Sequence, residues 1–217
     1  MRRRFALALA FAAAVSASAS AGDFCALARQ SGTPQIPGLN IVYLTPLGDP
    51  ADAHKWTYII VHQMEGPPGA AKPAALAQHA NPTRRGVTLW VETDGTVYWS
   101  TAENEIPTHG DGANRTDNKY VDNRATYRVV TGQKSIGVEF SGNFPDVTRP
   151  ASPQQTEAWG ILMRFLQERY GIPPQNIYAH NWIDFKDSRY CEGCELAALA
   201  RRLAYRPSMG GPCPQPQ

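Results

Sequence analysis

Residues 56–62, with the sequence Trp-Thr-Tyr-Ile-Ile-Val-His, constrain the fold of this chain more than any other segment. The segment is rich in β-branched and aromatic residues and is apolar on both faces. This pattern is typical of a strand in the middle of a sheet that is covered on both sides. Gly-Pro-Pro-Gly at 66–69 ends the strand, and the Ala-rich residues 70–80 that follow are expected to be helical.

Three further strands are indicated by short-range patterns. Residues 86–91 and 96–101 flank Asp94-Gly95, which is the strongest short-range signal for a β-hairpin. Residues 135–142 alternate between apolar side chains on one face and small or polar side chains on the other. Glu139 belongs to the face of small residues, where a ligand has room to approach.

The clearest helix begins at Ser152-Pro153. Ser is a preferred N-cap residue, Pro suits the first helical position, and Gln155 completes a capping box. Gly171 is expected to end this helix. Residues 177–180 then form a short strand, and residues 195–205 form a final helix.

The alternation of strands and helices predicts a single α/β domain with a central mixed β-sheet flanked by helices. An N-terminal arm, residues 22–50, carries an edge strand at 39–44, and a long polar stretch spans 103–133. Loops of that length in compact domains are usually functional or disordered. We expect no domain boundary inside 22–206, with the core at about 55–205.

Residues 1–21 have the features of an export signal. Arg2, Arg3 and Arg4 precede an apolar run at 5–15, and Ala-Ser-Ala at 19–21 fits a cleavage site. The run is too short for a membrane-spanning helix, which needs about 20 residues. An uncleaved amphipathic segment is the alternative. We expect cleavage near Ala21, a secreted or periplasmic protein without an integral membrane span, and a Pro/Gly-rich tail at 207–217.

The net charge of the chain limits the kinds of partner that it is expected to bind. The formal net charge is +2, and residues 1–21 carry three Arg and no acid, so the processed chain is at −1. Nothing in this charge favours nucleic-acid binding.

The four cysteines, Cys25, Cys191, Cys194 and Cys213, could form two disulfides in any of three pairings. If Cys191 bound a metal, at most one disulfide would remain; Cys25–Cys213 would then join the chain ends and Cys194 would be free.

Two histidines and a cysteine follow predicted strands and could bind one metal ion. His62 ends the first strand, His180 ends the strand at 177–180, and Cys191 lies in a Gly-containing turn. Three protein ligands with a fourth position open to water are typical of catalytic zinc. The alternatives are two structural histidines, and a disulfide or redox pair between Cys191 and Cys194.

Two charged residues suit hydrolysis at such a metal. Glu139 could act as the base for a water molecule, and Arg189 could stabilise an oxyanion because its charge persists at any relevant pH. The alternatives are a solvated carboxylate on a strand face and a surface arginine in a polar loop.

These motifs occur in an order that resembles the zinc N-acetylmuramoyl-L-alanine amidases, or type-2 amidases, which include the peptidoglycan recognition proteins. The resemblance is carried by Val61-His62, Ser-Ile-Gly-Val-Glu at 135–139, Ala179-His180 and Arg-Tyr-Cys-Glu-Gly at 189–193. It covers about 55–194. The resemblance implies cleavage of the amide between N-acetylmuramic acid and L-alanine of the stem peptide, with one Zn²⁺ ion at the edge of the sheet.

The resemblance also implies roles for individual residues: His62, His180 and Cys191 as zinc ligands, Glu139 as the base, and Arg189 in place of the family's Lys. His109 lies where the family has a segment near the substrate groove, although it could equally be a loop histidine without a role. The sequence departs from the family at Glu192, where Pro is usual. Asp187 is the alternative third ligand if Cys191 is in a disulfide.

The sequence therefore predicts a secreted zinc amidase whose partner is peptidoglycan or its muropeptide fragments. Two rival functions fit the same sequence. The same fold could bind muropeptides without cutting them, in which case a ligand would be missing or blocked. Alternatively, a zinc hydrolase could act on another amide, because the metal chemistry does not fix the acyl group.

Overall fold

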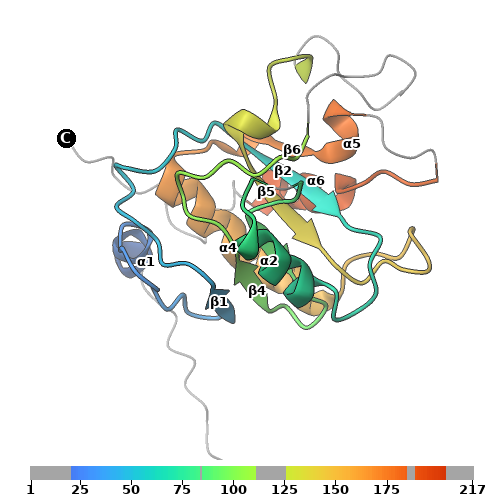
Figure 1. The fold of residues 1–217 in the computed structure, drawn as a ribbon, viewed down its shortest axis with the longest axis horizontal. Helices are drawn as coiled ribbons and strands as arrows, with labels where there is room; N and C mark the ends of the chain where they lie inside the picture. Colours follow the sequence, from blue (N-terminus) through green and yellow to red (C-terminus); the bar gives the residue numbers. More distant parts are fainter. Residues whose placement is uncertain (1–20, 84, 111–125, 185–188, 204–217) are drawn as a thin grey trace, which may run out of the picture.

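The structure is a computed structural model that describes residues 21–83, 85–110, 126–184 and 189–203. Its elements carry the labels of Figure 1, and η denotes a 3-10 helix. In chain order they are α1 (Ala21–Ala28), β1 (Ile41–Tyr43), β2 (Tyr58–Gln63), α2 (Ala71–Ala80), β3 (Leu89–Val91), β4 (Val97–Trp99), η1 (Gly132–Lys134), β5 (Ser135–Phe140), α4 (Pro153–Tyr170), η2 (Pro174–Asn176), β6 (Ile177–Ala179), α5 (His180–Ile183) and α6 (Cys194–Leu203).

The strands form one mixed sheet in the order β1-β4-β3-β5-β2-β6. Only β3 and β4 pair in antiparallel fashion among the described strands. They form the predicted hairpin: Gly95 is left-handed, with a φ of 85°, and the Thr96 N–H donates to Asp94 Oδ1 at 2.8 Å. β2 has a neighbour on each side, as its apolar sequence predicts, and β1 lies at an edge. The predicted fold class is confirmed.

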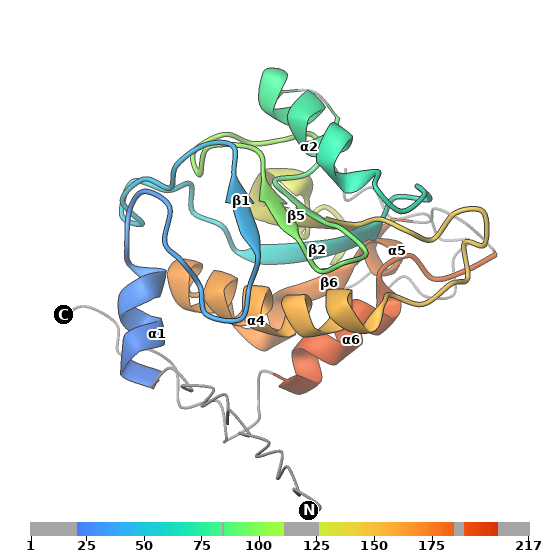
Figure 2. The ribbon, with the colours of Figure 1, turned by 90° about the horizontal axis from the view of Figure 1, so that it is seen from below.

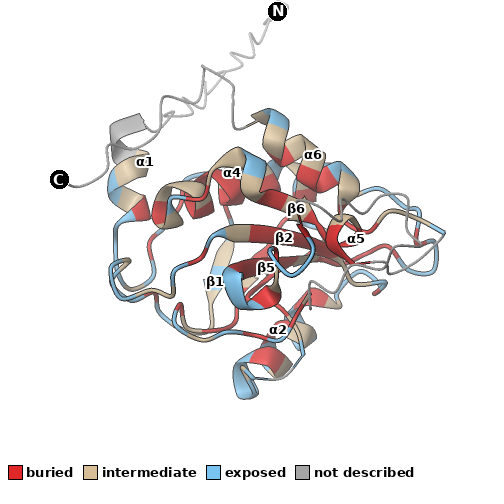
Figure 3. Ribbon diagram, turned by 90° about the horizontal axis from the view of Figure 1, so that it is seen from above, coloured by how far each residue is buried: buried red, intermediate tan, exposed pale blue. Residues whose placement is uncertain are grey.

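Helices cover both faces of this sheet, as Figures 2 and 3 show. α4 and α6 lie against one face, and α2 lies against the other. Because strand side chains alternate, Ile59 and Val61 of β2 and Val138 of β5 enter the core on the side of α4. His62 and Glu139 are therefore directed to the opposite face, away from that core.

α4 has the ends that its sequence predicts. The Gln155 N–H donates to Ser152 Oγ at 3.0 Å, and the Ser152 N–H donates to Gln155 Oε1 at 2.9 Å, which is the capping box. Gly171 ends the helix in the left-handed conformation, with a φ of 65°. The apolar side of α4 is fully buried at Trp159 and Leu162, so this helix supplies much of the core.

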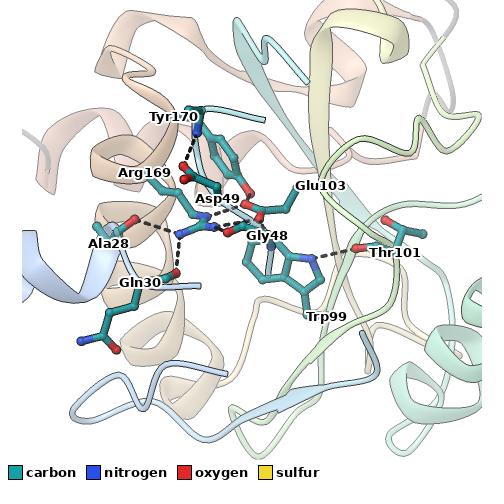
Figure 4. Close-up of polar contacts among 10 residues, drawn as sticks. Ala28, Gln30, Gly48, Asp49, Trp99, Thr101, Glu103, Arg169 and Tyr170 are labelled. Carbon is teal, nitrogen blue, oxygen red and sulfur yellow. Dashed lines mark hydrogen bonds and ion pairs between the residues drawn. The ribbon is translucent and has the colours of Figure 1, made fainter. Parts of the chain in front are cut away.

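The N-terminal arm contains a helix, α1, that the Gly/Pro-rich sequence of residues 22–50 does not indicate. Arg169 near the end of α4 connects this arm to the domain, as Figure 4 shows. Its guanidinium donates to the carbonyls of Ala28, Gln30 and Gly48 at 3.0, 2.9 and 2.8 Å, and it pairs with the Glu103 carboxylate. A buried guanidinium requires such acceptors, so the arm and the domain depend on each other.

Glu92, directly after β3, has a similar role on the α2 side of the sheet. Its carboxylate accepts from the N–H groups of Gly69 and Ala71 at 2.9 and 3.1 Å, and from the Ser141 hydroxyl at 2.8 Å. Burial alone would raise the pKa of Glu92, but these hydrogen bonds outweigh it and lower the pKa from 4.5. The carboxylate thus fixes the start of α2.

Several sequence predictions concern residues that the structure leaves out. The export signal at 1–21, apart from its last residue, and the tail at 207–217 lie outside the described residues, as do residues 111–125 of the long polar stretch. Within the described ranges, no helix combines the length and the apolar character needed to span a membrane.

Replacing Arg169 with Met should destabilise the domain by about 3–5 kcal/mol, because it leaves the buried Glu103 carboxylate without its cation. Urea denaturation measures the change. Arg202, exposed on α6, is the matched control: Arg202→Met should change the free energy of unfolding by less than about 0.5 kcal/mol. Equal effects of the two substitutions would contradict this role of Arg169.

Glu92→Gln should lower the free energy of unfolding at pH 7 by about 1.5–3 kcal/mol, the range for hydrogen bonds to charged groups. Because the folded-state pKa of Glu92 is lowered, its contribution is complete above the unfolded-state pKa near 4.5 and is lost as the pH falls through the folded-state value. Urea denaturation between pH 7 and pH 3 should therefore show the two proteins converging at low pH. A constant difference would rule out this assignment; the exposed Glu157, changed to Gln, serves as the control.

Candidate metal centre

The central strands bring His62 and Glu139 to the same face of the sheet. β2 and β5 are parallel, and His62 lies directly opposite Glu139 in their register. Paired residues of neighbouring strands project to the same side. His62 is buried, Glu139 is half-buried, and both line a cavity of about 260 Å³ together with His180 and Glu192.

His180 reaches this cavity because it begins α5 directly after β6. β6 pairs in parallel with β2, which brings the carboxyl ends of the two strands together. Asp184, one helical turn later, lies behind the ring: His180 Nε2 is 3.5 Å from Asp184 Oδ2. A carboxylate at this nitrogen leaves Nδ1 of His180 for the cavity.

Glu192 completes the cluster from a tight turn that packs against β2. The Gly193 N–H donates to Gln63 Oε1 at 3.0 Å, and the Asn181 N–H donates to the Glu192 carbonyl at 3.3 Å. Gly193 has a φ of 78°, and a β-carbon at this position would lie 2.2 Å from the Val61 carbonyl oxygen. Only glycine fits here, so the turn holds Glu192 at a fixed place beside β2.

The three residues offer ligand atoms to a common point. Glu192 Oε1 is 3.3 Å from His62 Nδ1 and 3.1 Å from His180 Nδ1. One potential ligand atom from each residue lies within 4.8 Å of the others, and all three residues are buried. Two imidazoles and one carboxylate form a ligand set that binds catalytic zinc, so the residues present fit a single metal ion.

The electrostatics of the cluster agree with a metal-binding role. Burial alone would raise the pKa of Glu192, but hydrogen bonds and charge attraction from His180 and His62 outweigh it and hold the pKa well below 4.5. Glu192 is therefore a carboxylate at neutral pH. Burial, together with the neighbouring His62, lowers the pKa of His109 well below 6.5, so His109 is a neutral imidazole.

The structure differs from the sequence prediction at the third ligand position. Cys191 forms a disulfide with Cys194, and a sulfur atom in that bond has no thiolate to offer a metal. Glu192, the next residue, takes the place beside the two histidines. Cys25 is disulfide-bonded as well, and the alternative ligand Asp187 lies outside the described residues.

Arg189 is not brought into the cluster. Its guanidinium is 3.1 Å from Glu65 Oε2, its side chain is 57% exposed, and it is not among the residues lining the cavity of His62 and His180. Its neighbour Tyr190 does line that cavity. A role for Arg189 at an oxyanion therefore stays a prediction.

His109, predicted to contact substrate, is buried next to the cluster. Its Nδ1 is 3.1 Å from His62 Nε2, and its Nε2 is 3.1 Å from the Ser135 carbonyl oxygen. His109 also lines a second, larger cavity of about 1040 Å³. Its contact with substrate stays a prediction, while its contact with His62 is new.

Sequence reasoning missed two members of the site, Glu192 and Asp184. The sequence signal for Glu192 is its departure from the family pattern at the position directly after the predicted ligand Cys191. The only sequence signal for Asp184 is its place four residues after His180, a spacing that puts two side chains on one side of a helix. That signal required recognising α5, which has only four residues.

The fold and the site together define an α/β domain with a candidate metal centre at the carboxyl ends of parallel strands. Residues 52–194 match the family model described as N-acetylmuramoyl-L-alanine amidase. This match covers more than half of the 217 residues. The chain therefore belongs to the N-acetylmuramoyl-L-alanine amidase family, whose members hydrolyse an amide bond of peptidoglycan.

The chain is also similar to several solved structures. The endolysin amidase LysCS from Clostridium intestinale URNW is 18% identical, with a TM-score of 0.46, over 67% of this chain and 84% of that one. A mutant endolysin from Bacillus subtilis is 20% identical, with a TM-score of 0.44, over 75% and 99%. An AmpD derivative is 14% identical, with a TM-score of 0.49, over 78% and 96%. No curated protein sequence matches the chain, so the assignment rests on the family model.

The assignment of Glu192 in place of Cys191 is testable by zinc binding. Glu192→Gln should weaken zinc binding by more than the roughly 10–100-fold that changes behind a ligand usually cost. The double substitution Cys191→Ser/Cys194→Ser should keep stoichiometric zinc, because it leaves Glu192 and both histidines in place. Chelator competition measures both dissociation constants. Loss of zinc in the double-serine variant, with zinc retained in Glu192→Gln, would restore Cys191 as the ligand.

Proposed function

We propose that this protein is a zinc-dependent N-acetylmuramoyl-L-alanine amidase that separates the glycan strands of peptidoglycan from their stem peptides. The observation that carries the proposal is the buried cluster of His62, His180 and Glu192, with Glu139 lining the same cavity. Family membership supplies the reaction type, and the cluster supplies the residues that would perform it.

His62, His180 and Glu192 would hold the zinc ion through two Nδ1 atoms and one carboxylate oxygen. When bound, zinc supplies Lewis acidity, which lowers the pKa of water at the site to about 7 and polarises a carbonyl group. Glu139 accepts a proton from the water that attacks the lactyl carbonyl carbon. It then delivers this proton to the alanine nitrogen as the C–N bond breaks, so the products are a carboxylic acid and an amine.

The larger cavity suits the substrate's peptide. It continues from His109 and His180 and is lined by Lys55, Arg85 and Lys134. Stem peptides carry free carboxylates, and lysine and arginine side chains attract them. The position of this cavity supports a binding mode in which the peptide extends from the metal centre over these three cations.

We further propose that the protein acts outside the cytoplasm, after cleavage near Ala21. The N-terminal sequence supports this localisation, as do the disulfide between Cys191 and Cys194 and the bonded state of Cys25. Disulfides persist in oxidising compartments and are rare in the cytosol. The substrate lies in the same place, since peptidoglycan surrounds the cell membrane.

A module that binds muropeptides without cutting them is the alternative, and one observation favours it. The disulfide removes the thiolate at Cys191 that the family resemblance implies as a ligand. If Glu192 did not replace this ligand in solution, the site would lack metal and the protein would only bind. Zinc analysis of the purified wild-type protein separates these cases.

Digestion of purified cell walls, followed by mass spectrometry of the products, tests the proposed reaction. The wild-type protein should release intact stem peptides that begin with L-alanine and leave glycan strands with free lactyl groups. Products cut within the peptide, with the lactyl–alanine link intact, would contradict the proposed bond. No product at all, with muropeptide binding retained, would favour the binding module.

Glu139→Gln should lower the rate of this digestion by about 10²–10⁴-fold, the usual contribution of a general base. Its zinc content should stay at the wild-type level, because Glu139 is not one of the three clustered ligands. Glu157→Gln, on the exposed side of α4, is the matched control and should retain full activity. Full activity in Glu139→Gln would remove Glu139 as the base.

A further inference from the structure

The ring of His109 connects a zinc-facing histidine to the backbone of the sheet. One nitrogen, Nδ1, is 3.1 Å from His62 Nε2, and the other, Nε2, is 3.1 Å from the carbonyl oxygen of Ser135. The rings of His62 and His109 meet edge to face, with centroids 5.2 Å apart. His109 is buried and lies at the junction of the two cavities.

These two contacts favour one placement of the hydrogens on the two rings. A carbonyl oxygen only accepts hydrogen bonds, so Nε2 of His109 must carry the hydrogen that is donated to Ser135. In a neutral imidazole the other nitrogen, Nδ1, is then an acceptor. A hydrogen on His62 Nε2 completes this contact, and it leaves Nδ1 as the nitrogen of His62 that a metal ion would take. That nitrogen is the one directed toward Glu192 and His180.

Two glycines provide the space that the ring and the backbone of His109 occupy. A β-carbon at position 137 of β5 would lie 2.8 Å from His109 Cε1 and 2.6 Å from Val87 Cγ1. A β-carbon at position 132 would lie 1.6 Å from the His109 carbonyl oxygen. Gly137 thus allows the ring of His109 to lie on β5, and Gly132 allows the backbone of His109 to pass close to η1.

We propose that His109 is a positioning residue of the metal centre: it fixes the tautomer and orientation of His62, so that His62 presents Nδ1 to the zinc ion. The inference rests on the proposed function, because it assigns the cluster to zinc. Asp184 orients His180 in the same way, whereas His62 is oriented by the ring of His109, which is anchored to the carbonyl of Ser135. Partners behind metal ligands orient them and raise their basicity.

Substitutions at position 109 separate positioning from simple packing. Asn places an amide oxygen near the position of Nδ1 and so keeps the acceptor, but it loses volume. Phe keeps the volume but has no acceptor. Positioning predicts that His109→Asn binds zinc more tightly than His109→Phe, whereas packing predicts the reverse order. His79→Phe is the matched control, because the His79 ring also contacts a backbone carbonyl but belongs to an exposed position of α2.

Chelator competition gives the zinc dissociation constant of each variant, and the melting temperature of the zinc-free form reports its folding. His109→Phe should raise the dissociation constant by about 10–100-fold, His109→Asn by less, and His79→Phe should not change it. Wild-type affinity in a folded His109→Phe variant would overturn the inference while leaving the zinc amidase intact. Absence of zinc from the wild-type protein would overturn the proposed function, and this inference with it.

A second measurement needs no variant and holds even if His109→Phe does not fold. Proton–nitrogen correlation spectra of histidine rings identify which nitrogen carries hydrogen. In the zinc-loaded wild-type protein, both His62 and His109 should carry hydrogen on Nε2, and Nδ1 of His109 should be unprotonated. Hydrogen on Nδ1 of His109 would exclude the acceptor role and overturn the inference.

Discussion

The parallel pairing of β2 with β5 and β6 is the constraint on which the site depends. It places the carboxyl ends of three buried strands at one edge of the sheet, where His62, Glu139 and His180 emerge side by side. Because side chains alternate along a strand, a shift of one residue in this register would exchange the faces of His62 and Val61. Burial of the apolar residues on the side of α4 therefore directs the alternate residues, including His62 and Glu139, to the opposite face.

Much of this arrangement follows from local sequence patterns. The two-sided apolar run predicts β2, Asp94-Gly95 predicts the hairpin, and the Ser152 capping box predicts α4, because each signal is created by neighbours in the chain. His62 and His180 are predictable as a pair since both follow buried strands. Their separation of more than a hundred residues is bridged by sheet topology, which the alternation of elements implies.

The remaining parts of the site depend on geometry that spacing alone does not encode. Cys191 and Glu192 are adjacent, and which of them faces the histidines is decided by the left-handed Gly193 and its close approach to the Val61 carbonyl. The position of His109 depends on the absence of a side chain at Gly137, a contact between distant segments. Asp184 depends on a helix of four residues. For Glu192 and His109, a tertiary contact selects among local alternatives that the sequence leaves equal.

The disulfide makes the position of Glu192 depend on whether the protein is in an oxidising or a reducing compartment. Cys191 and Cys194 enclose Glu192 and Gly193 within a covalent ring, which restricts the conformations from which Glu192 could turn away from the histidines. Ordering a ligand before the metal arrives reduces the entropy lost on binding. In a reducing compartment the ring would open, and a thiol would become available next to Glu192. The arrangement of His62, His180 and Glu192 in the structure is therefore that of the oxidised protein.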